Sequence, residues 1–224
     1  MNSRSIVLSI IVFCLLMCFA HPASAQTGTG ATVTAGALLP SGKYGEYFST
    51  GYGINAGFPI ATAKTTVWHV LIGYGRISLD NTALNESDAY NSEQGNYDVS
   101  GAIRIYPLLL GITFFPDREG AKPYGLLDFG VYMVSAKFNG GTYTKPDGTQ
   151  SVFSSSSQFR AEPGLNLGIG ALLPLSPGKL LDLGVRYHFV KDSQYSNFTG
   201  TGATSTYVGF SQYFSLSVGL EFSY

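Results

Sequence analysis

Residues 214–224, at the carboxyl end of the chain, alternate between large apolar and small or polar side chains without interruption. The apolar positions that share one face are Phe214, Leu216, Val218, Leu220, Phe222 and Tyr224. A period of two indicates a β-strand, because successive side chains of a strand point to opposite faces. A strand that crosses a membrane within a barrel has about 9–11 residues and turns such an apolar face toward lipid. The pattern therefore predicts a membrane-spanning strand.

Seven earlier stretches also have the pattern of strands. With the last one, they are residues 31–39, 50–60, 66–79, 97–115, 123–138, 158–173, 180–190 and 212–224. Short turns alternate with longer connections rich in Ser, Thr, Gly, Asn and Tyr, which are residues 41–49, 80–96, 139–157 and 191–211. Outer-membrane barrels have this asymmetry, with their long loops outside. We expect an all-β fold, an eight-stranded antiparallel up-and-down transmembrane β-barrel.

The polar face of these strands is rich in small residues, as in the run Gly164, Asn166, Gly168. A soluble barrel would present Lys and Glu to water on that face, whereas eight strands enclose only enough room for side chains. The composition therefore favours a polar lumen and an apolar outer wall.

Two segments fit the alternation poorly. If every second residue from Arg76 faces the lumen, Trp68 and other large apolar side chains also face the lumen. A bulge near residues 73–75 would remove this conflict and is expected. Pro107 lies inside a long apolar run although a closed barrel has no edge strand to host it, which predicts a bulge at residues 107–108 or a break in the strand.

The amino end has the features of a cleaved signal peptide. Arg4 precedes an apolar run, and the sequence Ala-Ser-Ala at residues 23–25 forms a cleavage site. We expect a signal peptide at residues 1–25 and a barrel domain at residues 26–224. A lipoprotein attached through Cys18 remains the alternative. Both cysteines of the chain lie in this segment, so the mature domain has neither a disulfide nor a thiol nucleophile.

Charge is scarce, at 12% of residues against about 25% in ordinary soluble domains. The near-neutral balance of 13 basic and 14 acidic residues gives no indication of nucleic-acid binding. Beyond the signal peptide, no segment has the 18 or more consecutive apolar residues of a membrane helix. A chain that is exported and this poorly charged is typical of a membrane barrel, and we expect it in the bacterial outer membrane.

Several segments carry a resemblance to a known family: TGYGINAGFPI at residues 50–60, IYPLLLGITFF at 105–115, KPYGLLDFGV at 122–131, residues 163–173 and the terminal strand. The chain resembles the outer membrane protein β-barrel domain family, in particular the small eight-stranded barrels similar in architecture to OmpX and OmpA. The resemblance covers residues 31–224. Its motifs are patterns of glycine, aromatic and apolar residues, so they imply a fold and say little about activity.

The parity that we assign to the lumen collects a set of charged and titratable side chains. They are Arg104, Asp128, Arg160, Glu162, Asp182, Arg186, His188 and Glu221. An ion path is one interpretation. A hydrogen-bonded structural network is favoured, because the signs are mixed and charges in a narrow lumen must be paired. Candidate pairs are Arg160 with Glu162, and Arg186 with Asp182 or His188.

No cofactor, metal or catalytic residue is expected. Barrels that deacylate lipid A carry a Ser two residues after a His, whereas His188 is followed by Phe189 and Val190. Asp80, Glu86, Asp88 and Glu93 form an acidic loop whose spacing matches no calcium motif, so a solvated surface loop is the favoured interpretation.

The expected function is a structural or surface-interaction role with a packed, nearly closed lumen. A narrow porin-like channel is the alternative, and a lipid A-modifying enzyme is the third. Expected partners are outer-membrane lipid and lipopolysaccharide, an extracellular ligand at the long loops, and the outer-membrane insertion machinery, for which Phe222 and Tyr224 resemble the assembly signal. We expect a monomer.

Overall fold

The fold is that of a computed structural model, which describes residues 30–42, 45–63, 65–86, 95–116, 121–198 and 206–222. Within these residues the strands are β1 (Thr32–Ser41), β2 (Gly51–Thr62), β3 (Thr66–Ser78), β4 (Asn96–Phe114), β5 (Lys122–Thr144), β6 (Gln150–Phe153), β7 (Ser156–Ser176), β8 (Lys179–Phe198) and β9 (Thr206–Phe222). A 3-10 turn, η1 (Gly45–Tyr47), and a short helix, α2 (Asn81–Glu86), lie between strands. The predicted signal peptide and Tyr224 lie outside the described residues.

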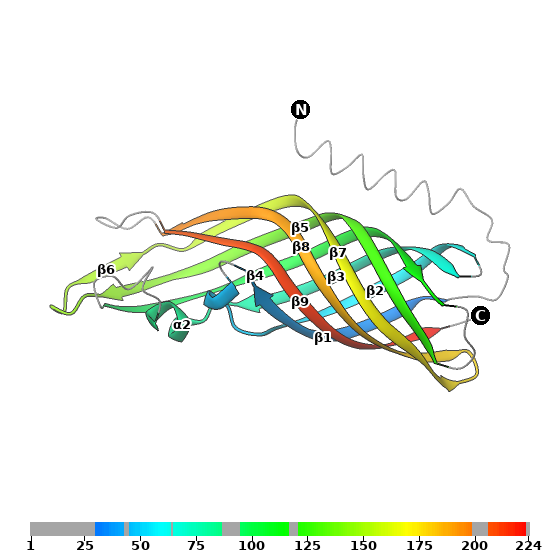
Figure 1. The fold of residues 1–224 in the computed structure, drawn as a ribbon. Coiled ribbons are helices and arrows are strands. Elements are labelled where there is room, and N and C mark those ends of the chain that lie inside the picture. Colours follow the sequence, from blue (N-terminus) through cyan, green and yellow to red (C-terminus); the bar gives the residue numbers. More distant parts are fainter. Residues whose placement is uncertain are drawn as a thin grey trace, which may run out of the picture.

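Eight of the strands close into an antiparallel barrel, as predicted (Figure 1). Neighbours follow the order β4, β3, β2, β1, β9, β8, β7, β5, and a further pairing of β4 with β5 closes the ring. The first and last strands pair in register from Thr32 opposite Glu221 onward, so both ends of the barrel domain lie at the same rim. Closure leaves no unpaired strand edge in the lipid, which is the condition for a sheet to span a membrane.

The strands extend further beyond one rim than the alternation predicted. β5 has 23 residues and β7 has 21, about twice the length that a membrane requires. The predicted loop 139–157 is largely a hairpin in which β6 pairs with the end of β5, and most of the predicted loop 191–211 continues β8 and β9. Tyr143 and Phe153 of the hairpin are buried in an apolar cluster, whereas Val152 is exposed.

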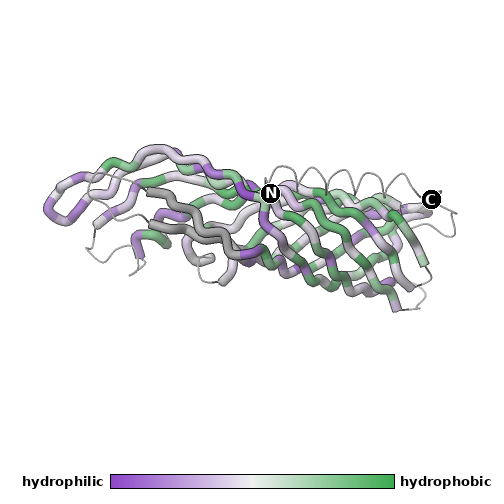
Figure 2. Tube along the Cα trace, turned by 90° about the horizontal axis from the view of Figure 1, so that it is seen from above, coloured by the Kyte–Doolittle hydropathy of each residue, from purple (hydrophilic) through white to green (hydrophobic). Residues whose placement is uncertain are grey.

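Large apolar side chains remain exposed around the other half of the barrel. They include Ile54, Phe58, Trp68, Ile72, Leu127, Phe129, Leu167, Ile169, Val185, Leu216 and Val218. Figure 2 shows these hydrophobic positions concentrated in the half near the carboxyl-terminal end, and hydrophilic positions at the hairpin tip of β5 and β6. This belt is the surface that lipid covers. In the described residues, no helix is both long enough and apolar enough to span a membrane.

The predicted irregularities in β3 and β4 are wrong. The register of β3 against β2 and β4 is unchanged through Gly73 and Gly75, and Trp68 and Arg76 both face outward. Pro107 pairs with Tyr132 without a register shift, while the β3–β4 ladder omits two pairs beside it. Proline has no N–H to donate, and the β3–β4 ladder is interrupted at this point. The strands on either side keep their register across the interruption.

Candidate functional site: the barrel lumen

The inward-facing side chains divide the lumen into two parts. In the outer part, toward the long connections, a fully buried apolar and aromatic cluster fills the section. It includes Ile77, Ile103, Ile105, Tyr132, Val134, Ala136 and Phe138, each at most 1% exposed. Leu84 of α2 and Phe48 after η1 belong to the same cluster, so segments of the outer connections pack onto its end. In the other part, toward the short turns, polar side chains line a cavity of about 60 Å³.

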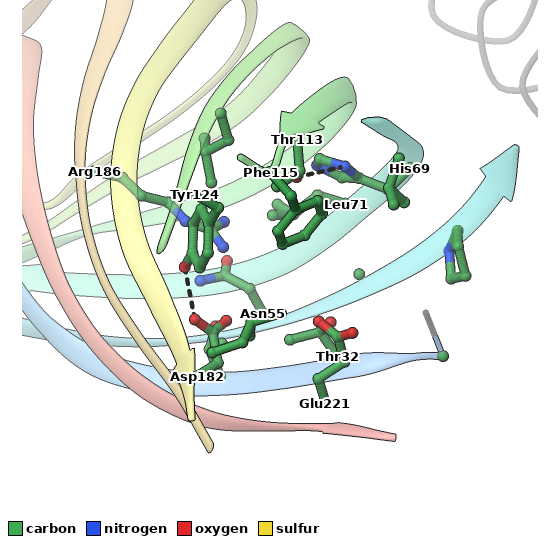
Figure 3. A pocket seen from close by; sticks show the side chains of 17 residues that line it. Thr32, Asn55, His69, Leu71, Thr113, Phe115, Tyr124, Asp182, Arg186 and Glu221 are labelled. Carbon is green, nitrogen blue, oxygen red and sulfur yellow. Dashed lines mark hydrogen bonds between the residues drawn. The ribbon is translucent and has the colours of Figure 1, made fainter. Parts of the chain in front are cut away.

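The polar part is drawn in Figure 3. Tyr124 of β5 donates a hydrogen bond to the carboxylate of Asp182 on β8, with an Oη–Oδ1 distance of 2.6 Å. Arg186, four residues further along β8, points into the same space, and Glu221 of β9 lines its far side. Tyr124 thus reaches across the lumen to a carboxylate on a strand that is not its neighbour in the sheet.

Arg186 is buried, and its Nε and Nη1 atoms have no protein partner within the described residues. The same holds for Oε1 of Glu221 and Oδ2 of Asp128. Opposite charges therefore share the lumen without forming the direct pair of Arg186 with Asp182 or His188 that the sequence suggested. A cavity of this volume can hold a few water molecules, which would bridge such groups.

A second contact joins His69 of β3 to Asp128 of β5, with 2.9 Å between Nε2 and Oδ1. The ring also lies 3.4 Å through Nδ1 from the hydroxyl of Thr113 on β4. Gly111 of β4 is the strand partner of both His69 and Asp128, so the hydrogen bond passes over a residue without a side chain. A Cβ at Gly111 would overlap Asp128 Oδ1.

A third contact set surrounds His188 of β8. Its Nδ1 lies 3.0 Å from the hydroxyl of Tyr132, and its Nε2 lies 2.9 Å from the hydroxyl of Ser215. The imidazole stacks on Tyr213, with ring centroids 4.1 Å apart. Both ring nitrogens of this buried histidine are engaged, which orients the side chain at the boundary between the polar and apolar parts.

The other predicted lumen residues lie elsewhere. Arg104 faces outward, which corrects the prediction: its neighbours Ile103 and Ile105 are fully buried, whereas Arg104 is half-exposed. Arg160 is exposed toward the outer end of β7, and Glu162 below it is half-buried. Arg104 was misassigned because the inward face of β4 is as apolar as the outward face, so alternation does not distinguish them.

Sequence reasoning also missed His69, Tyr124 and Tyr132, which supply most of the lumen hydrogen bonds. The set assigned to the lumen contained charged side chains and one histidine, His188, and none of these three residues. One signal was available. Gly73, Gly75 and Ile77 share parity with His69, and a small-residue face of this kind marks the lumen elsewhere in the chain.

Of the two histidine contact sets, that of His69 borders the cavity. His188 and Ser215 are both buried in the lumen, whereas lipid A chemistry needs such a pair at the membrane boundary. The backbone N–H groups around His69 and Thr113 lie within paired strands, so the ladder occupies the donors that an oxyanion hole would need. Among the described residues no cluster of three metal-ligating side chains occurs.

The acidic loop is described only in part. Asp80 accepts hydrogen bonds from the backbone N–H groups of Thr82 and Ala83, at 3.0 and 3.2 Å, and so caps the first turn of α2. Asp88 and Glu93 lie outside the described residues. Phe222, one of the two proposed assembly-signal residues, is half-buried at the end of β9.

A closed eight-stranded barrel with an apolar belt and a side-chain-filled lumen defines the class of small outer-membrane barrels. The chain belongs to the outer membrane protein beta-barrel domain family, which matches residues 10–222. This membership places the protein in the bacterial outer membrane. No curated protein sequence matches the chain.

Solved structures support the same fold. The outer membrane protein OprG from Pseudomonas aeruginosa superposes with a TM-score of 0.51 at 14% identity, over 89% of this chain and 98% of that chain. A major outer membrane protein from Thermus thermophilus gives a TM-score of 0.50 at 15% identity, over 87% of this chain and all of that one. At these identities the likeness concerns the fold alone.

Proposed function

We propose that this protein is a non-conducting outer-membrane barrel with a structural or surface-interaction role. The observation that carries the proposal is the apolar cluster in the outer part of the lumen. Ile103, Tyr132 and Phe138 come from adjacent strands and are at most 1% exposed. An ion passing this section would lose its hydration without gaining polar partners, which is strongly unfavourable.

The extensions of the strands beyond the lipid belt support a role at the cell surface. β5 and β6 form a hairpin at the outer end, and Val152 on it is 68% exposed. Strands of 17–23 residues supply far more than the membrane needs. The excess forms a rigid surface that an extracellular ligand can contact. Ligand sites on rigid elements are held more precisely than sites on loops.

The porin-like alternative is supported by the periplasmic cavity, which water can enter, and by the Arg186 nitrogen atoms in it that have no protein partner within the described residues. A cavity of about 60 Å³ below an apolar cluster is a pocket and not a pore. Enzymatic modification of lipid A is not proposed, since His188 and Ser215 meet inside the barrel.

Planar-bilayer recording tests the closed lumen. We expect the wild-type protein to give no steady conductance under conditions in which a 16-stranded porin, whose lumen is a water-filled channel, conducts. A double variant, Tyr132→Ala with Phe138→Ala, removes two rings from the cluster. We expect this variant to give brief, intermittent conductance. Large and steady conductance of the wild type would overturn the proposal in favour of the channel.

Cysteine labelling tests the orientation on which the surface role depends. Residues 26–224 contain no cysteine, so a single Asp147→Cys variant reports on the hairpin tip and Ser176→Cys on the opposite rim. In intact cells, a membrane-impermeant maleimide should label residue 147 only, and lysis should expose residue 176. Labelling of residue 176 alone in intact cells would contradict the surface assignment.

A further inference from the structure

Three basic side chains gather on the outer wall of the barrel, where β3, β4 and β5 lie side by side (Figure 1). Arg76 and Arg104 are direct partners in the β3–β4 ladder. Lys137 of β5 is the partner of Ala102, two residues from Arg104 on the same face. Diagonal neighbours of this kind are within reach of long side chains. The three side chains line a hollow of about 330 Å³, which we call the basic hollow.

The basic hollow is shaped by the bulge between Val99 and Gly101 and by the segment that begins α2. Besides the cations it carries Ser100 and Asn139, whose side chains are hydrogen-bonded to each other over 3.1 Å. Asn139 donates in this bond, so the hydroxyl hydrogen of Ser100 is available to another acceptor. The lining is thus rich in donors that point outward from the barrel wall.

The cations of the basic hollow have no counter-charge in the described part of the chain, where no ion pair or hydrogen bond is seen for Arg76, Arg104 or Lys137. Like charges placed directly opposite in a ladder repel each other and weaken the pairing. An Arg–Arg pair on a barrel wall is therefore unfavourable in isolation, and an anion held between the two guanidinium groups removes the repulsion.

The height of the basic hollow relative to the membrane follows from the aromatic residues beside it. Tyr74 and Tyr106 lie two residues from Arg76 and Arg104, on the side of the lipid belt, with ring centroids 5.5 Å apart. Tyr52 continues this row at 6.5 Å from Tyr74. Rows of outward aromatic residues mark the membrane–water interface of barrels. Two residues of strand span about 7 Å, so the cations stand at the headgroups on the side of the long connections.

We propose that the basic hollow binds the phosphate groups of lipopolysaccharide in the outer leaflet. The planar guanidinium of an arginine donates two parallel hydrogen bonds to a phosphate, and a lysine adds a point charge. Arg76 and Arg104 hold one phosphate between them, Lys137 neutralises its remaining charge, and Ser100 donates to an oxygen. The acyl chains then run down the apolar belt past the tyrosine row. This site is independent of whether the lumen conducts.

Thermal unfolding of the detergent-folded protein in the presence of purified lipid A measures this binding, because a ligand that binds only the folded state raises the unfolding temperature. Four preparations are compared: the wild type, Arg76→Gln/Arg104→Gln, Arg76→Lys/Arg104→Lys, and Lys122→Gln/Lys179→Gln. The last removes the same charge at the opposite rim. A heat-modifiable gel shift establishes that each variant is folded. Two further ligands are tested. Dephosphorylated lipid A shows whether the phosphate groups are needed, and inorganic phosphate shows whether the lipid is needed.

We expect lipid A to stabilise the wild type and the rim control, with at least a tenfold weaker apparent affinity in Arg76→Gln/Arg104→Gln and an intermediate loss in the lysine variant. Dephosphorylated lipid A should bind much more weakly than lipid A. Equal affinity in the wild type and the glutamine variant, or an equal loss in the rim control, would overturn the site. Stabilisation by inorganic phosphate as strong as that by lipid A would overturn the lipid assignment and leave a small-anion site.

Discussion

Gly111 permits the hydrogen bond that ties β3 to β5 across the lumen. It lies on β4 between His69 and Asp128, and the 2.9 Å contact of those two side chains passes over its Cα. A methyl group at this position would overlap Asp128 Oδ1 and lie 2.6 Å from His69 Nε2. Gly111→Ala is therefore expected to separate the two side chains without removing either.

The expected cost follows from the surroundings of Asp128. The carboxylate is fully buried, and its second oxygen has no partner within the described residues, so separation removes its hydrogen bond to His69. Loss of a hydrogen bond to a charged group costs about 1.5–3 kcal/mol, and stranding one member of a buried pair costs about 3–5 kcal/mol. Alanine recovers about 0.5–1 kcal/mol through its lower backbone entropy. We expect a net loss of about 2–4 kcal/mol.

Reversible urea unfolding in detergent, followed by the fluorescence of the single tryptophan, Trp68, measures this loss. Gly125→Ala is the matched control, because a Cβ there meets nothing within 4 Å and the substitution should be neutral or slightly stabilising. In an Asp128→Ala background the cost of Gly111→Ala should shrink, since the overlapping oxygen is gone. Equal stability of the two glycine variants, or an undiminished cost in the Asp128→Ala background, would refute the reasoning.

Three further predictions concern other parts of the chain. Tyr132→Phe removes the hydroxyl that contacts His188 Nδ1 at 3.0 Å and should cost about 1–3 kcal/mol in the same unfolding assay, with an unchanged value counting against that hydrogen bond. The backbone N–H of Thr149 donates to Asp147 and holds the pKa of that exposed carboxyl below its ordinary value. The turn is therefore stabilised above the ordinary pKa and loses this contribution as pH falls through the lowered one, which an NMR titration of Asp147 checks. Leu220→Asp places a carboxylate on the lipid face of β9 and should reduce the amount of protein in outer-membrane fractions, whereas wild-type levels would exclude a role for that face in insertion.

The sequence by itself determined the class of fold and the eight barrel strands. The information is local: each lipid-facing strand must present an apolar residue at every second position, and residues 163–173 and 214–222 do so visibly. The short and long connections predict which rim faces the periplasm, and this orientation is what the cysteine labelling tests. Asp128, Asp182, Arg186 and His188 could be placed on the inward face by the same count.

Only the tertiary structure decided the contents of the outer lumen and the positions of the basic side chains. Along β4 both faces are apolar, one toward lipid and one toward the buried cluster, so alternation gives no direction there. Arg104 was assigned inward for that reason, and the register of the neighbouring strands turns it outward, beside Arg76. The hydrogen bond between His69 and Asp128 joins residues 59 positions apart. Such contacts depend on how the strands stagger when the sheet closes, a property of the whole barrel that no single segment encodes.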